Sequence, residues 1–400
     1  MTKTDSAFLD VHVLHAVPFS NLNRDNLGTP KQMVYGGATR ARISSQCTKR
    51  AARLWLEQNT DLGTALRTRR LPQLVRERLM ADEVFADDDD AKQAVVSMFA
   101  NAKGKGVKKG ITVEEVGSDG DGHELQSDQL TFTTTEAAAA VARVIASCKD
   151  EVLAEGFKPD PPTKKALTSA LHAHNPIIAL CGRMLAALPE TNVDGALQVA
   201  HAFTTHTSTL ELDYFTAVDD QLQLDGDEAG AGHINVGEYT SGVFYRHATI
   251  GLRQLAELLD DSEAAVAEVA GSFIRAFALA EPTGKQNSAN AHTRPDLMAV
   301  TLRSDRPVSF AAAFEKPVEP GRNGGFMNAS IEALHRRAAL ENQMYGPEGV
   351  IDSWYVESET PDVSGLGDPL DSLNDLVRVV EHNIAPTTTR SDGERAAHDF

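Results

Sequence analysis

The clearest chemical signal in the sequence is a run of cations without anions. Between Asn26 and Leu56 there is no acidic residue, although the whole chain has 57 acidic and 38 basic residues and a net charge of −19. A polyanion meets one face of a protein rather than its average charge, so the run predicts an anionic partner on a local face. The cations of the run are Lys31, Arg40, Arg42, Lys49, Arg50 and Arg53.

A second basic segment and several acidic segments lie outside this run. The lysines are Lys103, Lys105, Lys108 and Lys109, in KGKGVKKG. The acidic residues concentrate at 86–91, 118–124 and 224–230, where neighbouring Gly, Ser and Ala indicate solvated loops. The acidic remainder is expected to keep the protein in solution.

Patterns that carry known catalytic chemistry are missing. The sequence has no GxxxxGK[ST], HExxH or GxSxG motif, and PTGKQN at 282–287 is interpreted as a lysine in a turn. His12 and His15 would lie on opposite faces of a strand, and His201 and His206 are interpreted as structural histidines. We expect no catalytic residues, no cofactor and no metal site.

The run of cations includes a predicted helix. Ser44 or Ser45 is a suitable N-cap, and the N–H groups at such a helix start suit a phosphate. Contacts of this kind hold a nucleic-acid backbone without reading its sequence. The expected apolar stripe of the helix is Ile43, Cys47, Ala51 and Leu54. The flanking polar face is Gln46, Lys49, Arg50 and Arg53.

The elements that must position these groups can be read from periodicity. We expect a strand at 8–17, a mostly helical insertion at 57–175, a hairpin formed by 209–218 and 233–250, a helix at 257–280 and a strand at 297–303. In the hairpin, Tyr214 and Phe215 should face opposite sides, one in the core and one free. No RNP1 pattern is present, so stacking of RNA bases on a sheet is not predicted.

Length and composition place the chain among globular proteins. Its 400 residues suggest two or three domains, and 42% of the residues are hydrophobic. The three cysteines are far apart, which argues against disulfides and zinc, and no segment resembles a signal peptide or membrane span. We therefore expect a cytoplasmic protein without a membrane partner. The cysteines are Cys47, Cys148 and Cys181.

Several long strings resemble the CasC backbone subunit of type I-E CRISPR Cascade complexes. They are SNLNRDNLGTPKQMVYGGATRARISSQCTKRA (20–51), DGALQVAHAFTTH (194–206), DYFTAVDD (213–220) and SGVFYRHATI (241–250), and they occur in the same order as in the family. The helical insertion and the C-terminal tail carry little of the resemblance.

The resemblance implies an α+β fold shaped like a hand. An RRM-like (ferredoxin-like) palm would comprise 1–56 and 176–385, with helical fingers at 57–175 and a β-hairpin thumb at 208–240; residues 386–400 are expected to be disordered. The implied function is that of a non-enzymatic CRISPR RNA-binding subunit of an antiviral ribonucleoprotein. Copies would polymerise as a helical filament along the guide spacer, kink the RNA and present it to target DNA, together with other Cascade subunits.

The resemblance also implies which residues hold the guide. In the first loop and around the helix start these are Asn23, Arg24, Lys31, Ser44, Gln46, Lys49 and Arg50, to which the cationic run adds Arg42. Met184, Phe215 and Thr216 would lie at the kink in the RNA. The lysines of 103–109 are candidates for contact with target DNA, and a solvated loop is the alternative.

Two other functions remain open on the sequence. Related backbone subunits of other CRISPR types cut target RNA with a loop aspartate, which makes Asp25 the candidate residue of a metal-dependent RNA endonuclease. An aspartate between Arg24 and Asn26 could more simply orient the arginine by a charge-assisted hydrogen bond. A protein-interaction module that needs no RNA is the third possibility.

Overall fold

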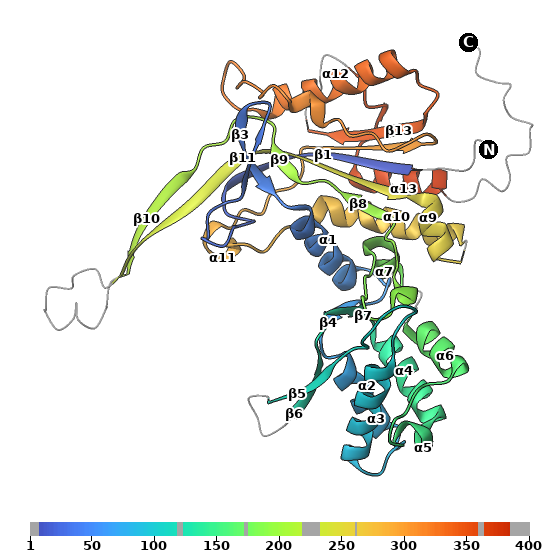
Figure 1. Cartoon of the computed structure of the whole chain (residues 1–400). Helices are drawn as coiled ribbons and strands as arrows, with labels where there is room; N and C mark the ends of the chain where they lie inside the picture. The colour runs from blue at the N-terminus through green and yellow to red at the C-terminus, as the bar shows by residue number, and fades with distance from the viewer. Residues whose placement is uncertain are drawn as a thin grey trace, which may run out of the picture. The chain divides into compact units, whose positions relative to one another are not determined.

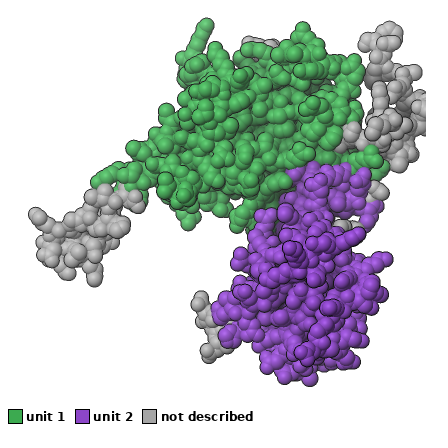
Figure 2. Space-filling view, viewed as in Figure 1, with its two compact units in different colours: residues 1–58, 198–253, 263–400 green, residues 59–197, 254–262 purple. Residues whose placement is uncertain are grey.

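The structure, a computed structural model, describes residues 8–117, 123–171, 175–217, 233–260, 262–358 and 364–384, without the side chains of 216, 217 and 233–235. The chain divides into two compact units (Figure 2): unit 1 contains 1–58, 198–253 and 263–400, and unit 2 contains 59–197 and 254–262. The predicted tail at 386–400 and the acidic loop at 224–230 lie outside the described residues.

Unit 1 is built on one large sheet with the strand order β14-β13-β12-β1-β11-β9-β3-β2. Strand β1 confirms the strand predicted at the N-terminus; it is antiparallel to both of its neighbours, β11 and β12. The strands are β1 (Phe8–Ser20), β2 (Gln32–Tyr35), β3 (Ala38–Ile43), β9 (Ala202–Thr204), β11 (His233–Gly251), β12 (Leu297–Arg303), β13 (Val350–Glu357) and β14 (Asp368–Pro369).

Helices cover both faces of this sheet (Figure 1). Helices α1 (Ser45–Asn59), α10 (Glu263–Leu279) and α13 (Leu373–Ile384) lie on one face, and the short helix η2 (Ala311–Phe314) and α12 (Met327–Tyr345) lie on the other. On the second face Leu14, Tyr245 and Leu334 belong to one buried cluster. We therefore expect an RNA-binding surface in unit 1 at loops, helix ends, strand ends or the hairpin.

A crossover connection joins two of the central strands. Strands β11 and β12 are parallel with β1 between them, and α10 connects them, which is a split βαβ unit. The predicted helix at 257–280 begins too early: α10 covers only Glu263–Leu279, and residues 257 and 258 are the end of a separate helix, α9 (Leu252–Leu258). Asp260 between them has φ 56°, a left-handed conformation that ends a helix.

The predicted hairpin is confirmed. Strand β10 (Glu211–Ala217) pairs antiparallel with the first part of β11, with Tyr214 opposite Val236, and the pair projects beyond the sheet in Figure 1. The expectation that one of Tyr214 and Phe215 is in the core is wrong, because 64% and 48% of these side chains are exposed. A two-stranded ribbon outside the sheet has no second layer to bury either face.

Unit 2 is mainly helical, as predicted, and also contains two small sheets. Its core includes Leu79, Met98, Val141 and Ile145. Its helices are α2 (Leu71–Ala81), α3 (Asp88–Asn101), α4 (Thr135–Ser147), α5 (Lys149–Val152), α6 (Pro161–Leu171), α7 (Pro176–Cys181) and η1 (Pro189–Thr191). The sheets pair β4 (Leu66–Thr68) with β7 (Thr131–Thr133) and β5 (Val113–Gly117) with β6 (His123–Ser127). Two short elements remain: β8 (Leu197–Val199), which pairs with β11, and α11 (Gln286–Ala289), which belongs to unit 1.

Across the described part of the chain, the helices are too short or too polar for any of them to cross a lipid bilayer.

Candidate nucleic-acid interface

The loop at 21–31 is held in shape by its own side chains. Asn21 Nδ2 donates to the carbonyl of Gly28 at 2.9 Å and to that of Glu238 at 2.8 Å. Asp25 Oδ1 accepts from the backbone N–H groups of Leu27 at 2.9 Å and Thr29 at 3.0 Å. Asp25 therefore closes the turn, a role other than the predicted one of orienting Arg24.

The junction between β3 and α1 lies against this loop. Ser44 Oγ accepts from the N–H of Cys47 at 3.3 Å, which confirms Ser44 as the N-cap. Asn23 Oδ1 accepts from the N–H of Ser44 at 2.8 Å, and the N–H of Lys31 donates to the carbonyl of Asn23 at 2.9 Å. Since Ser44 is only 6% exposed, it acts by shaping the helix start.

The first amide of α1 is bound by a residue that is distant in sequence. His201 Nδ1 accepts from the N–H of Ser45 at 3.1 Å and lies 3.3 Å from Arg42 Nη1. Ser44 and His201 thus satisfy two of the N–H groups at the helix start. Among the described residues, only the N–H of Gln46 is left without a protein partner at this end, so the expected set of free N–H groups is reduced to one.

The six cations of the sequence run do not share one face. Arg40 is fully buried; its guanidinium donates to the carbonyls of Thr204 at 2.8 Å and Phe314 at 2.9 Å, and burial lowers its pKa. Arg53 forms an ion pair with Glu57 at 2.6 Å. The remaining cations, with two amide side chains, form what we call the α1 basic surface: Asn23, Lys31, Arg42, Gln46, Lys49 and Arg50.

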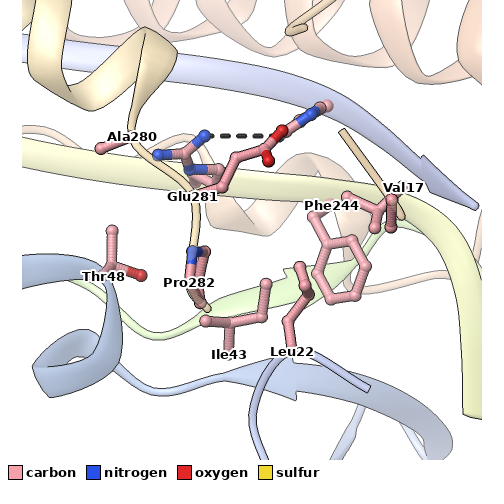
Figure 3. Close-up of a pocket in the computed structure, with 11 residues that line it drawn as sticks. Val17, Leu22, Ile43, Thr48, Phe244, Ala280, Glu281 and Pro282 are labelled. Atoms are coloured by element: carbon pink, nitrogen blue, oxygen red, sulfur yellow. Dashed lines mark hydrogen bonds between the residues drawn. The ribbon is translucent and has the colours of Figure 1, made fainter. Parts of the chain in front are cut away.

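One side of α1 is buried. The buried residues of α1 are Thr48, Ala52 and Leu56. They lie one or two positions after Cys47, Ala51 and Leu54 of the predicted stripe, which are only half-buried. Figure 3 shows the cavity below Thr48, which has a volume of about 20 Å³. Such a cavity has space for about one water molecule and not for a ligand.

A larger groove runs along the side of α1, with a volume of about 440 Å³. The helix contributes Arg50 and Trp55 to its wall, and residues 279–284 form the opposite side. This segment approaches the first loop so closely that a Cβ at Gly284 would lie 2.4 Å from the carbonyl oxygen of Leu22. Lys285, the lysine of the predicted turn, has its Nζ 4.8 Å from the centre of the Tyr239 ring.

The projecting hairpin presents different side chains on its two faces. Leu212, Tyr214 and Val236 share one face by strand alternation and cross-strand pairing, and Phe215 is on the other. All four are exposed by 48% or more of their surface. Thr216 continues the strand, opposite Ile234, and its side chain is outside the described residues.

Unit 2 brings together two other predicted segments. Arg183 is buried and donates to the carbonyls of Thr191 and Leu171, and burial lowers its pKa to about 10. The adjacent Met184 is 80% exposed. The lysine segment is hydrogen-bonded to the residues that follow Met184. The N–H of Gly104 donates to the carbonyl of Ala187 at 2.9 Å, and the N–H of Lys105 donates to Glu190 Oε1 at 2.8 Å. The side chains of Lys103, Lys105, Lys108 and Lys109 are all exposed.

The described residues contain one trio that could share a metal ion: Asp10, His12 and His247. The two imidazole rings stack, with centroids 4.8 Å apart and planes inclined by 22°. A ring nitrogen's lone pair lies in the ring plane, so the two lone pairs run side by side instead of converging. Both carboxylate oxygens of Asp10 accept hydrogen bonds, from Thr249 Oγ1 and the N–H of Val308. The trio is a buried cluster under η2 and does not include Asp25.

Sequence reasoning missed His201 as a part of this surface. The sequence shows it only as one of two histidines near a run of threonines, and it predicts a structural role for both. That interpretation is confirmed for His206, which is buried and hydrogen-bonded through both ring nitrogens. His201 differs because it is exposed and touches the helix start.

Comparison with known proteins gives consistent results. The model of the CT1975-like protein family matches residues 9–379. Two solved structures are similar: a chain of a "CRISPR RNA-guided surveillance complex, pre-nicking" (36% identity, TM-score 0.83, covering 94% of this chain and 100% of that one) and a chain of a "CRISPR RNA-guided surveillance complex" (30% identity, TM-score 0.72, covering 94% and 99%). A search of curated proteins finds no match. The type I-E assignment stays a prediction, and the chain belongs to the CT1975-like family of Cas proteins of the Cascade type.

Proposed function

We propose that this protein is the guide-binding backbone subunit of a Cascade-type surveillance complex. The observation that carries the proposal is the α1 basic surface, a set of hydrogen-bond donors and cations on a chain of net charge −19. Two acceptors at this surface are already used inside the protein: Asn23 Oδ1 by Ser44 and, next to Arg42, His201 Nδ1 by Ser45. A surface of this kind is suited to the phosphate oxygens of RNA, which accept hydrogen bonds and carry negative charge.

Binding of this kind is independent of the spacer sequence. Lys31, Arg42, Lys49 and Arg50 would neutralise phosphates and release counterions, while base pairing between guide and target supplies specificity. The exposed Phe215, with Thr216 beside it, is the wedge that we assign to the kink. Met184, in unit 2, is a separate candidate for contact with the kinked guide. Unstacking a base step costs a few kcal/mol, which contacts with protein offset.

The proposal extends to the partners. Copies of the chain would follow one another head to tail along the guide, which gives an open helical filament ended by other Cascade subunits. The exposed lysines at 103–109 would contact target DNA. The protein would act as a scaffold without catalytic residues, in contrast to an endonuclease that uses Asp25.

A charge reversal on the α1 basic surface tests the proposal. Lys49→Glu should weaken binding to every spacer sequence alike and reduce the slope of log K against log salt by about 0.7 for each lost phosphate contact. The measurement is fluorescence anisotropy of labelled guides across a salt series. The matched control is Arg378→Glu, the same charge change at a 78% exposed side chain of α13. Equal affinities for both variants and the native protein would reject the α1 basic surface as the guide site.

A further inference from the structure

The hydrogen bonds of His201 determine which of its nitrogens carries the proton. A peptide N–H and a guanidinium can only donate, so the Nδ1 atom that faces Ser45 N–H at 3.1 Å and Arg42 Nη1 at 3.3 Å must be the lone-pair nitrogen. In the neutral ring the proton is then on Nε2. Among the described residues no protein group accepts a hydrogen bond from Nε2, and the side chain is exposed.

The Asn23 side chain is also oriented by a backbone amide, that of Ser44, the residue before Ser45. Its Oδ1 accepts from the N–H of Ser44, so its Nδ2 is the group left over, and Nδ2 can only donate. Two consecutive amides, of Ser44 and Ser45, thus fix two side chains from distant parts of the sequence. Each side chain is left with a donor of fixed position and no charge, beside Arg42.

We propose that His201 is a further guide-contacting residue, whose Nε2–H donates to an acceptor oxygen of the RNA backbone. This inference rests on the proposed function, since it assumes that the guide lies on the α1 basic surface. The acceptor is a phosphate oxygen or a ribose 2′-hydroxyl, both of which occur at every nucleotide. The contact adds affinity without adding charge, which separates it from the lysines and arginines around it.

Two isosteric substitutions separate this contact from a purely internal role. In His201→Asn, the amide oxygen takes the place of Nδ1, so the bond to Ser45 is kept and the outward donor is lost. In His201→Gln, the amide nitrogen takes the place of Nε2, so the donor is kept and the acceptor for Ser45 is lost. We expect His201→Asn to bind guide RNA roughly five- to tenfold more weakly, the effect of one hydrogen bond, with an unchanged salt slope. We expect His201→Gln to retain most of the affinity.

The opposite pattern overturns the inference. If His201→Gln weakens binding and His201→Asn does not, the imidazole serves only to hold α1 and Arg42. Thermal melting of each variant confirms that binding is compared between folded proteins, and His201→Ala, which lacks both groups, should bind no better than His201→Asn. Repeating the measurement with DNA of the same sequence identifies the acceptor: a loss that persists indicates phosphate, and one that disappears indicates the 2′-hydroxyl.

Lys49→Glu, measured in the same assay, keeps this inference apart from the proposed function. If Lys49→Glu has no effect, the guide lies elsewhere and both proposals fail. If Lys49→Glu weakens binding while His201→Asn has no effect, only the role of His201 is rejected.

Discussion

Arg40 and Arg42 are two residues apart in β3 and have different surroundings. Arg40 is enclosed, and its guanidinium donates to the carbonyls of Thr204, Phe314 and Glu315, which joins β3 to the chain around η2. Arg42 is half-exposed beside His201. The same residue type thus serves the core at one position and the surface at the other.

This pair predicts a separation between stability and binding. Arg40→Leu should lower the free energy of unfolding by about 3 kcal/mol, because buried carbonyls lose their donor. Arg42→Leu should change it by less than about 0.5 kcal/mol and should weaken guide binding. Urea unfolding measures the free energy of unfolding of each variant, and fluorescence anisotropy measures its affinity for the guide. Unchanged stability in Arg40→Leu would contradict the structural role of that guanidinium.

Asp25 has a role that can be tested against catalysis. Its carboxylate holds the turn at Leu27 and Thr29, so Asp25→Ala should loosen the loop that carries Asn23 and Arg24 and weaken guide binding a few-fold. With target RNA and magnesium we expect no cleavage by either the native protein or the variant. Regularly spaced cuts by the native protein that disappear in Asp25→Ala would establish the endonuclease instead.

At the scale of the element, β1 contains two histidines that are buried on opposite faces of the sheet. Burial and the neighbouring charges of His247 and Arg303 hold the pKa of His12 well below its usual value. Burial, and then the Arg246 guanidinium, lowers the pKa of His15 to about 3. Both rings are therefore neutral in the folded protein, and the unfolded chain takes up their protons more readily than the native state does.

The sheet should accordingly lose stability in mild acid. Stability from these two rings is complete above the unfolded pKa of about 6.5 and is lost as the pH falls below it, by up to about 1.4 kcal/mol per pH unit for each ring. Urea unfolding at pH 7.5, 6.5 and 5.5 measures this dependence, and His15→Gln should reduce the slope. A flat profile over this range would mean that the rings accept protons without unfolding.

The hairpin of β10 and β11 predicts a difference between its two faces. Phe215→Ala should leave the salt-dependent part of guide binding intact and alter base exposure at the kinks, because the wedge is lost and the cations remain. The readout is fluorescence of 2-aminopurine placed along the guide. Tyr214→Ala removes an aromatic ring from the opposite face and is the matched control. Equal fluorescence changes in both variants would assign the wedge to the hairpin as a whole.

Elements were predictable from sequence where the signal is local. The N-cap at Ser44 and the alternating strands of the hairpin depend on neighbouring residues, and both are confirmed. Helical periodicity predicts the spacing of a stripe but not which of two adjacent stripes faces the core, and the buried stripe of α1 lies one or two residues after the predicted one. The place of Arg40 in the core and of His201 at the helix start depends on segments more than 150 residues away, which a single sequence does not bring together.

For the whole molecule, the decisive quantity is the contrast between a net charge of −19 and the local positive charge of the α1 basic surface. Copies of such a chain repel one another over a Debye length of about 10 Å at 0.1 M salt. In the proposed assembly, guide RNA would be attracted to the α1 basic surface of each copy. Assembly in the proposed filament therefore depends on the guide, which links copies that do not associate strongly by themselves.

This contrast predicts opposite effects of salt on two kinds of association. With guide RNA at low salt, we expect a defined assembly whose mass increases in proportion to guide length; without RNA, we expect shorter or irregular oligomers. Raising the salt should dissociate the RNA-bound assembly, because counterion release becomes less favourable, while it screens repulsion between free chains and promotes their association. Size-exclusion chromatography with light scattering measures both. An assembly of the same mass with and without guide, or one that does not grow with guide length, would mean that protein contacts alone set its size.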